Sequence, residues 1–313
     1  MKKKTLVGLC GLIVSGLLIS PSIHARAFSD DDAGTCGAEF LKLGVGARPI
    51  GMGEAFVAVA DDASSISWNP AGLREVNRRQ LAGMHAVWLE DFSYEYIAYA
   101  QPLKSGTLGA SINYLHMGDI DSLDEQGNTT GSLSFHDLAV NVAYSSRISQ
   151  LLWGINLKLI QEELAGSSAQ AYATDIGVIY KMDDKDKLKL GAVVQNLGTE
   201  IKYESAGDPL PLLIKAGAAY RLKSNLLLAA DINTPIDNDP SLHLGIEYKF
   251  NKLKNIDLAA RAGYKTTTIV DLDALSGLSA GLGCKISDIG IDYAWIQYGD
   301  LGNTHRISFL VSF

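Results

Sequence analysis

The chain of 313 residues is 47% hydrophobic and 20% charged, contains 31 glycines and carries a formal net charge of −8. This composition is too apolar for an intrinsically disordered protein, and three cysteines are too few for a disulfide-rich scaffold. The negative charge disfavours a nucleic-acid-binding protein, because such proteins normally present a basic surface.

Residues 1–27 have the pattern of a secretory signal peptide. Lysines directly follow the first residue, an uncharged and mostly apolar run covers residues 5–20, and Ala-Arg-Ala at 25–27 is typical of a cleavage site. The apolar run is too short for a membrane-spanning helix. We therefore expect an exported protein, in which Cys36 and Cys284 either form a disulfide or remain two free thiols.

Residues 28–80 predict a small unit that differs from the rest of the chain. A glycine-rich stretch covers residues 44–53, and a short helical pattern follows over residues 54–66. An Asn-Pro-Ala-Gly sequence at 69–72 has the residues of a turn, because proline fixes the backbone angle φ and glycine frees it.

From residue 81 onward, hydrophobic residues recur with a period of two, which is typical of β-strands with one apolar face. In the last strand, for example, Ile307, Phe309 and Val311 share one face. We predict fourteen such strands, over residues 81–88, 93–101, 106–116, 134–147, 151–162, 171–182, 187–196, 212–222, 225–233, 241–250, 256–264, 276–286, 289–298 and 304–313. Most are about nine to twelve residues long, which is the length that a tilted strand needs to cross a bilayer.

The connections between these strands alternate between long and short, as in outer-membrane barrels with short periplasmic turns and longer outside loops. A soluble β-sandwich seldom needs so many strands of this length, and a β-propeller would show a repeat of about 40 to 50 residues. We therefore predict an all-β protein in which residues 81–313 form a 14-stranded antiparallel transmembrane β-barrel.

The polar face of each strand would line the lumen of this barrel, and it carries charges of both signs together with many glycines. Fourteen strands enclose more space than their own side chains fill. We therefore expect residues 28–80 to fold into the lumen as a hatch of short helices, with the charges pairing to the hatch or bracing the wall. The predicted lumen-facing charges are Asp137, Lys158, Asp175, Lys215, Asp231, Glu247, Arg261, Asp292 and Arg306.

Motifs for catalysis and for metal or nucleotide binding are missing or incomplete. The glycine pattern at 51–56 lacks its third glycine and a following βαβ unit, the histidines have no metal-ligand spacing, and no nucleophile elbow occurs. We therefore predict that the protein is not an enzyme and has neither a cofactor nor a metal site.

Two segments resemble known outer-membrane proteins. Residues 40–62, FLKLGVGARPIGMGEAFVAVADD, together with WNPAGL at 68–73, resemble the N-terminal signature of the PorV/PorQ-like family. The sequence at 69–72 is also similar to the N-P-A motif in the hatch of FadL-type long-chain fatty-acid channels. The final Phe313 is similar to the C-terminal signal that the barrel assembly machinery reads. The residues that these resemblances place in the hatch are Gly44, Gly46, Gly51, Gly53, Asn69, Pro70, Ala71 and Gly72.

The resemblance implies a FadL-like barrel in the outer membrane of a Gram-negative-type bacterium, in contact with outer-membrane lipid. FadL-type channels handle hydrophobic molecules, whereas PorV-like proteins serve the type IX secretion system and receive secreted cargo. We expect a protein that binds or transports small hydrophobic molecules. The alternative is a component of a type IX secretion or surface-assembly system that binds secreted protein cargo, and an unselective porin-like protein is a third possibility.

Overall fold

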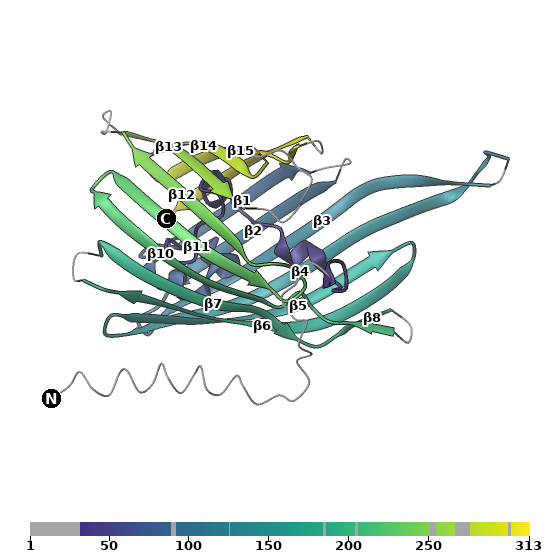
Figure 1. Ribbon diagram of the computed structural model, residues 1–313, viewed down its shortest axis with the longest axis horizontal. Coiled ribbons are helices and arrows are strands. Elements are labelled where there is room, and N and C mark those ends of the chain that lie inside the picture. The colour runs from purple at the N-terminus through teal and green to yellow at the C-terminus, as the bar shows by residue number, and fades with distance from the viewer. Residues whose placement is uncertain are drawn as a thin grey trace.

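The computed structural model describes residues 32–88, 92–124, 126–183, 186–203, 206–250, 255–266, 276–299 and 302–313. The predicted signal peptide, residues 1–27, lies outside the described residues. Within them, fourteen antiparallel strands close into a barrel (Figure 1), which confirms the predicted fold class.

The barrel is closed by pairing between its first and last strands, whose register runs from Gln80 opposite Ser312 to Val87 opposite His305. The barrel strands are β1 (Gln80–Val87), β2 (Ser93–Pro102), β3 (Thr107–Leu123), β4 (Thr129–Ile148), β5 (Leu151–Leu164), β6 (Ser167–Lys181), β7 (Leu188–Gly198), β10 (Leu213–Lys223), β11 (Leu226–Pro235), β12 (Ser241–Lys249), β13 (Ile256–Lys265), β14 (Leu278–Ile286), β15 (Ile289–Gln297) and β16 (Asn303–Ser312). Each predicted strand corresponds to one of these. Closure matters because an open sheet edge would expose unpaired backbone groups.

Two predicted loops contain strands. Residues 117–133 were expected to connect two strands, but β3 and β4 pair through most of this segment and form a hairpin that projects far beyond the barrel (Figure 1). The described side chains at 126–133 are exposed. A ribbon that meets water on both faces has no reason to alternate, so the period-two signal is missing there. A second hairpin, β8 (Ile201–Tyr203) with β9 (Ala206–Asp208), is too short for periodicity to reveal.

The outer face of the barrel is apolar. On β12, for example, Leu242, Leu244 and Ile246 point outward and are 41%, 42% and 40% exposed, whereas the intervening His243 is buried inside. Leu282, Ile291 and Ile307 continue this surface on β14 to β16. An outward apolar band of this kind is typical of barrels that face lipid. Among the described residues, no helix has the length and apolar character needed to cross a bilayer.

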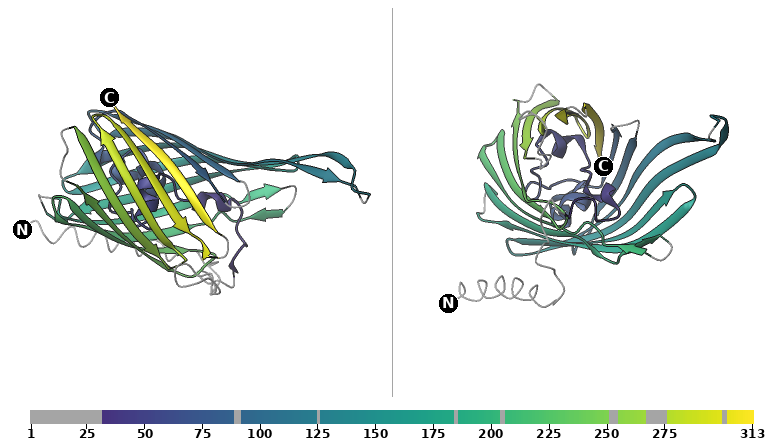
Figure 2. Two further views of the ribbon diagram at one scale, coloured as in Figure 1. Left: turned by 90° about the horizontal axis from the view of Figure 1, so that it is seen from above. Right: turned by 45° about the vertical axis from the view of Figure 1, so that its right-hand side comes forward.

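The hatch lies inside the barrel, where Figure 2 shows it as the purple segment surrounded by strands. It consists of η2 (Glu39–Lys42), α2 (Ala47–Gly51), α3 (Ser65–Trp68) and η3 (Pro70–Glu75). Apolar hatch side chains such as Ile50, Met52 and Phe56 are fully buried. Glycines on the inner wall allow this close approach: a Cβ atom on Gly191 would lie 2.8 Å from the carbonyl oxygen of Val57.

Candidate functional site

Asn69 fixes the centre of the hatch to the barrel wall. Its side chain is completely buried, and its amide nitrogen donates to the carbonyl oxygens of Val57 at 2.9 Å and Val178 at 3.2 Å. Its Oδ1 accepts a hydrogen bond from the backbone N–H of Ala71 at 3.2 Å, which caps η3. One asparagine therefore joins two parts of the hatch to strand β6.

The rest of the Asn-Pro-Ala-Gly sequence also lies against the wall. Pro70 begins η3, where its missing N–H has no helical partner to lose. The carbonyl oxygen of Ala71 accepts a hydrogen bond from Ser145 Oγ at 2.9 Å. Gly72 packs directly on the backbone of Ala60, and a Cβ atom there would collide with it. The predicted motif is therefore the point at which the hatch folds onto itself and onto β4.

Two of the predicted hatch glycines have backbone angles that L side chains rarely adopt. Gly46 has φ of 81° and Gly53 has φ of 64°. The N–H of Gly53 donates to Ser279 Oγ at 3.0 Å, and its carbonyl oxygen accepts from His243 Nδ1 at 2.8 Å. These turns bring the hatch backbone into hydrogen-bonding contact with β12 and β14.

The other two glycines permit close packing. A Cβ atom on Gly51 would lie 3.0 Å from Gly281 Cα on the wall, and one on Gly44 would lie 2.7 Å from Ile50 and 2.9 Å from Trp68. The four predicted glycines thus shape the hatch. None of them forms a ligand site by itself.

A buried network of charges joins the hatch to β12 and β13. Arg48 Nε donates to Glu247 Oε2 at 2.9 Å, and Arg48 Nη1 donates to Asp61 Oδ1 at 2.5 Å. The same Glu247 oxygen accepts from Arg261 Nε at 2.8 Å, and Arg261 Nη1 donates to Asp292 Oδ1 at 2.6 Å. Glu247, Arg261 and Asp292 belong to the predicted lumen-facing charges. Arg48 does not, because its wall partner Glu247 is 199 residues away in sequence, and Asp61 joins the network only through Arg48.

Two more predicted charges hold the hatch. Asp231 Oδ2 accepts hydrogen bonds from the backbone N–H groups of Phe56 at 2.7 Å and Val57 at 2.8 Å. Arg306 donates to the carbonyl oxygen of Gly44, and its guanidinium lies 4.9 Å from the ring centroid of Trp88.

Of the remaining predicted charges, Lys158 and Asp175 pair within the wall, whereas Lys215 contacts the hatch. Lys158 and Asp175 pair at 2.9 Å within the wall, and both also bond to Asn196, where the register of β6 and β7 shifts. They brace the wall. The ammonium of Lys215 lies 5.1 Å from the ring centroid of Trp68 in the hatch.

Further ion pairs hold the hatch, and no local sequence pattern predicts them. Glu75 pairs with Lys181 at 2.9 Å and with Lys189 at 3.0 Å. Glu54 pairs with Lys265 at 2.7 Å. Burial alone would raise the pKa of Glu54, but the Lys265 ammonium outweighs that effect and lowers it to about 2. Only a spatial arrangement reveals these pairs, because local sequence carries no signal for partners so far apart.

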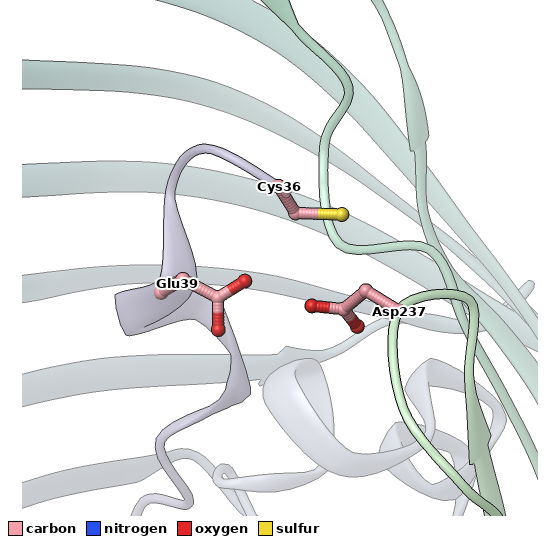
Figure 3. A group of neighbouring side chains, drawn as sticks. All are labelled: Cys36, Glu39 and Asp237. Carbon is pink, nitrogen blue, oxygen red and sulfur yellow. The ribbon is translucent and has the colours of Figure 1, made fainter. Parts of the chain in front are cut away.

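Three possible metal ligands meet where the hatch begins (Figure 3). The ligand atoms of Cys36, Glu39 and Asp237 all lie within 4.8 Å of one another. The ammonium of Lys42, however, is 2.6 Å from a carboxylate oxygen of Glu39 and 2.6 Å from one of Asp237, so it already supplies positive charge. Burial, followed by the charge of Asp237, raises the pKa of Cys36 to about 12. Cys36 and Cys284 are both free thiols.

A cavity of about 420 Å³ lies at the long-loop end of the barrel; we call it the mouth cavity. Its lining includes Phe40 of the hatch and Trp88, Phe92, Phe135, Asp137 and Glu162 of the wall. The rings of Phe92 and Phe135 pack edge to face, with centroids 5.2 Å apart. Of the predicted charges, Asp137 alone reaches this cavity. The aromatic residues were not predicted as site residues, because single aromatics at strand ends carry no local motif.

A second cavity of about 440 Å³ lies towards the short-turn end, behind the hatch. Its lining includes Arg48, Asp61 and Asp62 of the hatch and Lys249, Arg261 and Asp292 of the wall. This cavity has charges of both signs, whereas the lining of the mouth cavity combines aromatic and other apolar residues with acidic side chains. The described part of the hatch therefore separates two chambers of different chemistry.

Fold and hatch together define a plugged 14-stranded barrel of the kind found in FadL-type proteins. The chain belongs to the uncharacterised protein family UPF0164, which it matches over residues 22–312. Two UPF0164 proteins of Treponema pallidum (strain Nichols) are 22% identical over 280 residues and 27% identical over 169 residues. These alignments cover 82% and 50% of this chain. They cover 64% and 43% of the relatives, so the chain spans less than two thirds of their length.

Solved structures share the fold. The Pseudomonas putida toluene transporter TodX has a TM-score of 0.58 at 14% identity, covering 86% of this chain and 97% of its own. The Ralstonia pickettii toluene transporter TbuX has a TM-score of 0.58 at 13% identity, and the match covers 86% of this chain and 98% of TbuX. A Pseudomonas aeruginosa FadL homologue has a TM-score of 0.57 at 11% identity, and the match covers 86% of this chain and 98% of the homologue. The FadL-like fold is thereby confirmed, and the resemblance to PorV/PorQ-like proteins stays a prediction.

Proposed function

We propose that this protein is an outer-membrane channel that binds small hydrophobic molecules in the mouth cavity and admits them to the cell envelope when the hatch shifts. The observation that carries the proposal is the combination of a filled lumen with an aromatic cavity at the long-loop end. A pocket of about 300–1,000 Å³ lined mostly by apolar side chains is typical of small-molecule sites, and the mouth cavity has that size and lining.

The filled lumen argues against the unselective porin considered above. Porins of 16 to 18 strands leave an aqueous channel, whereas here the hatch backbone contacts the wall at Gly154, Gly191 and Gly263. A molecule that passes must therefore bind first and displace part of the hatch. This order of events favours a ligand-selective channel.

Location in the outer membrane is supported by the apolar exterior of the barrel. Two structural neighbours, TodX and TbuX, are toluene transporters, which agrees with the aromatic residues of the mouth cavity in this chain. Recognition of the barrel by assembly machinery through Phe313 belongs to the same proposal. Its ring lies beside Tyr99 on the barrel, with centroids 6.4 Å apart.

Binding of toluene to the detergent-solubilised protein tests the first step. Leu115 lines the mouth cavity and is 7% exposed, so Leu115→Trp should fill the cavity and weaken toluene binding at least tenfold. The matched control is Leu157→Trp, on the lipid-facing surface of β5, where Leu157 is 58% exposed. Unchanged toluene binding in Leu115→Trp, or no binding by the parent protein, would contradict the proposal.

The second step is tested by uptake. Expression in a Gram-negative host whose outer leaflet slows hydrophobic entry should accelerate accumulation of a neutral aromatic probe, and Leu115→Trp should abolish the gain. Equal accumulation with and without the protein would count against a channel.

A role in secretion remains a second candidate because the β3–β4 hairpin projects far from the barrel (Figure 1). Exposed β-ribbons can bind partners by adding a strand. In the native organism, deletion of residues 118–132 should then reduce surface display of secreted proteins while hydrophobic uptake continues. Unchanged surface display would remove this candidate.

A further inference from the structure

Two carboxylates face each other in the mouth cavity. Asp137 on β4 and Glu162 on β5 are direct register partners, so their side chains leave the sheet on the same face at neighbouring positions. Both line the mouth cavity. Two ionised carboxylates placed opposite each other repel, and the pair is destabilising unless it shares a proton or a positive group lies beside it.

The protein itself does not supply that positive charge within its described residues. Asp137 is 3% exposed, and its Oδ1 has no hydrogen-bond partner there. Glu162 Oε2 accepts a hydrogen bond from the hydroxyl of Tyr203 at 3.4 Å, and Glu162 also accepts one from the backbone of Ala38. Neither carboxylate forms an ion pair among the residues that the structure describes. An ionised carboxylate that is buried without a partner is strongly unfavourable, so a bound cation would stabilise this arrangement.

Nearby basic groups are engaged elsewhere. Lys42 is held between Glu39 and Asp237, at 2.6 Å from each. Arg306 donates to the hatch backbone and stacks on Trp88, and neither it nor Lys42 lines the mouth cavity. Glu39 adds a third carboxylate to the lining. The described lining therefore combines three acidic side chains with aromatic rings and includes neither lysine nor arginine.

Aromatic ring faces and carboxylates both favour the same kind of ligand, an organic cation. The face of an aromatic ring attracts organic cations, and an ammonium group next to a carboxylate gains further Coulomb energy. Phe40, Phe92 and Phe135 have rings in the lining of the same cavity as Asp137. A carboxylate ligand, such as a fatty acid, would meet like charge at this point.

We propose that the mouth cavity binds an amphipathic organic cation, with its ammonium group at Asp137 and Glu162 and its apolar body against the aromatic rings. This inference rests on the proposed channel function and names its ligand class. Asp137 and Glu162 then act as selectivity residues that hold the cationic group at the entrance, in front of the hatch.

The test compares three probes of similar shape by isothermal titration in a neutral detergent. Benzyltrimethylammonium is the cation, neopentylbenzene its neutral isostere and phenylacetate the anion. The cation should bind at least tenfold more tightly than the isostere, and the anion should bind more weakly than both. Equal binding of cation and isostere would overturn the cation preference but leave the channel proposal intact, whereas failure of all three to bind would overturn both.

Substitutions at the two carboxylates test whether these residues cause the preference for the cation. Asp137→Asn combined with Glu162→Gln should reduce the affinity for the cation at least tenfold and leave that for the isostere within about threefold. The matched control is Glu163→Gln, one residue further on, whose side chain pairs with His136 and is absent from the lining of the mouth cavity. Glu162→Gln alone, measured in parallel, provides a second variant if the double change impairs folding. Retention of the full cation preference in a folded double variant would contradict the assignment.

Discussion

The two ends of the lumen differ in whether their charged side chains have partners of opposite charge. Towards the short-turn end, Arg48, Glu247 and Arg261 satisfy one another in a buried network that fixes the hatch. At the mouth, Asp137 and Glu162 lie side by side without a basic partner among the described residues. In our proposal, charge therefore has a structural role behind the hatch and a recognition role in front of it.

Removal of Glu247 should give the largest loss of stability. Glu247→Gln leaves two guanidinium groups without their shared carboxylate, and breaking one partner from a buried ion pair costs about 3–5 kcal/mol. Unfolding in guanidinium chloride, with tryptophan fluorescence as the signal, measures the change. The control is Glu95→Gln, because the Glu95 side chain is 42% exposed. A loss similar to that of the control would show that the network does not hold the hatch.

A side chain on an inner-wall glycine should displace the hatch. A Cβ atom on Gly154 would collide with the backbone of Pro70, so Gly154→Val should open an aqueous path and raise conductance in planar bilayers severalfold. Gly131→Val is the matched control, since a Cβ atom there meets nothing within 4 Å. Low conductance in both variants would mean that the hatch tolerates this intrusion.

Asn69→Ala should loosen the hatch with a smaller effect on the barrel. The change removes the hydrogen bonds to Val57, Val178 and Ala71, at a cost of about 1–3 kcal/mol. Leakage of small ions should therefore rise more than the free energy of barrel unfolding falls, and Pro70→Ala should act in the same direction. Asn303→Ala, at an exposed position of β16, serves as the control. Equal leakage in Asn69→Ala and the parent would refute this role.

Acidification should give the smallest effect. The pKa of Glu54 is lowered to about 2 by Lys265, so its ion pair contributes stability above the ordinary carboxyl pKa of 4.5. This contribution decreases as the pH falls from 4.5 to 2. Protease cleavage of the hatch should increase over that window, and Glu54→Gln should flatten the dependence. An unchanged pH profile in Glu54→Gln would assign the effect to other groups.

The strands of the barrel wall could be predicted from the sequence because their pattern depends only on neighbouring residues. Leu242, Leu244 and Ile246 face outward while His243 faces inward, so apolar and polar residues alternate along the strand and make it recognisable in the sequence. Asn69 to Gly72 could be recognised for a similar reason, since a turn has characteristic residues. The β3–β4 hairpin was missed because it has no buried face.

The chemistry of the mouth was not predictable. Phe40 comes from the hatch, Phe135 and Asp137 from β4, and Glu162 from β5, and only the closed barrel brings them together. Asp137 was predicted to face the lumen, but its lack of a basic partner depends on where Lys42 and Arg306 are engaged. No local pattern encodes that distribution of charge.

The most direct test of the account is to lock the hatch. Ala47 N–H donates to Ser308 Oγ at 3.0 Å, so Ala47→Cys with Ser308→Cys, in a chain with Cys36 and Cys284 replaced by serine, places two thiols across the hatch–wall contact. After oxidation, toluene should still bind at the mouth but uptake of the aromatic probe should stop, and reduction should restore it. Undiminished uptake through the oxidised barrel would contradict passage past the hatch.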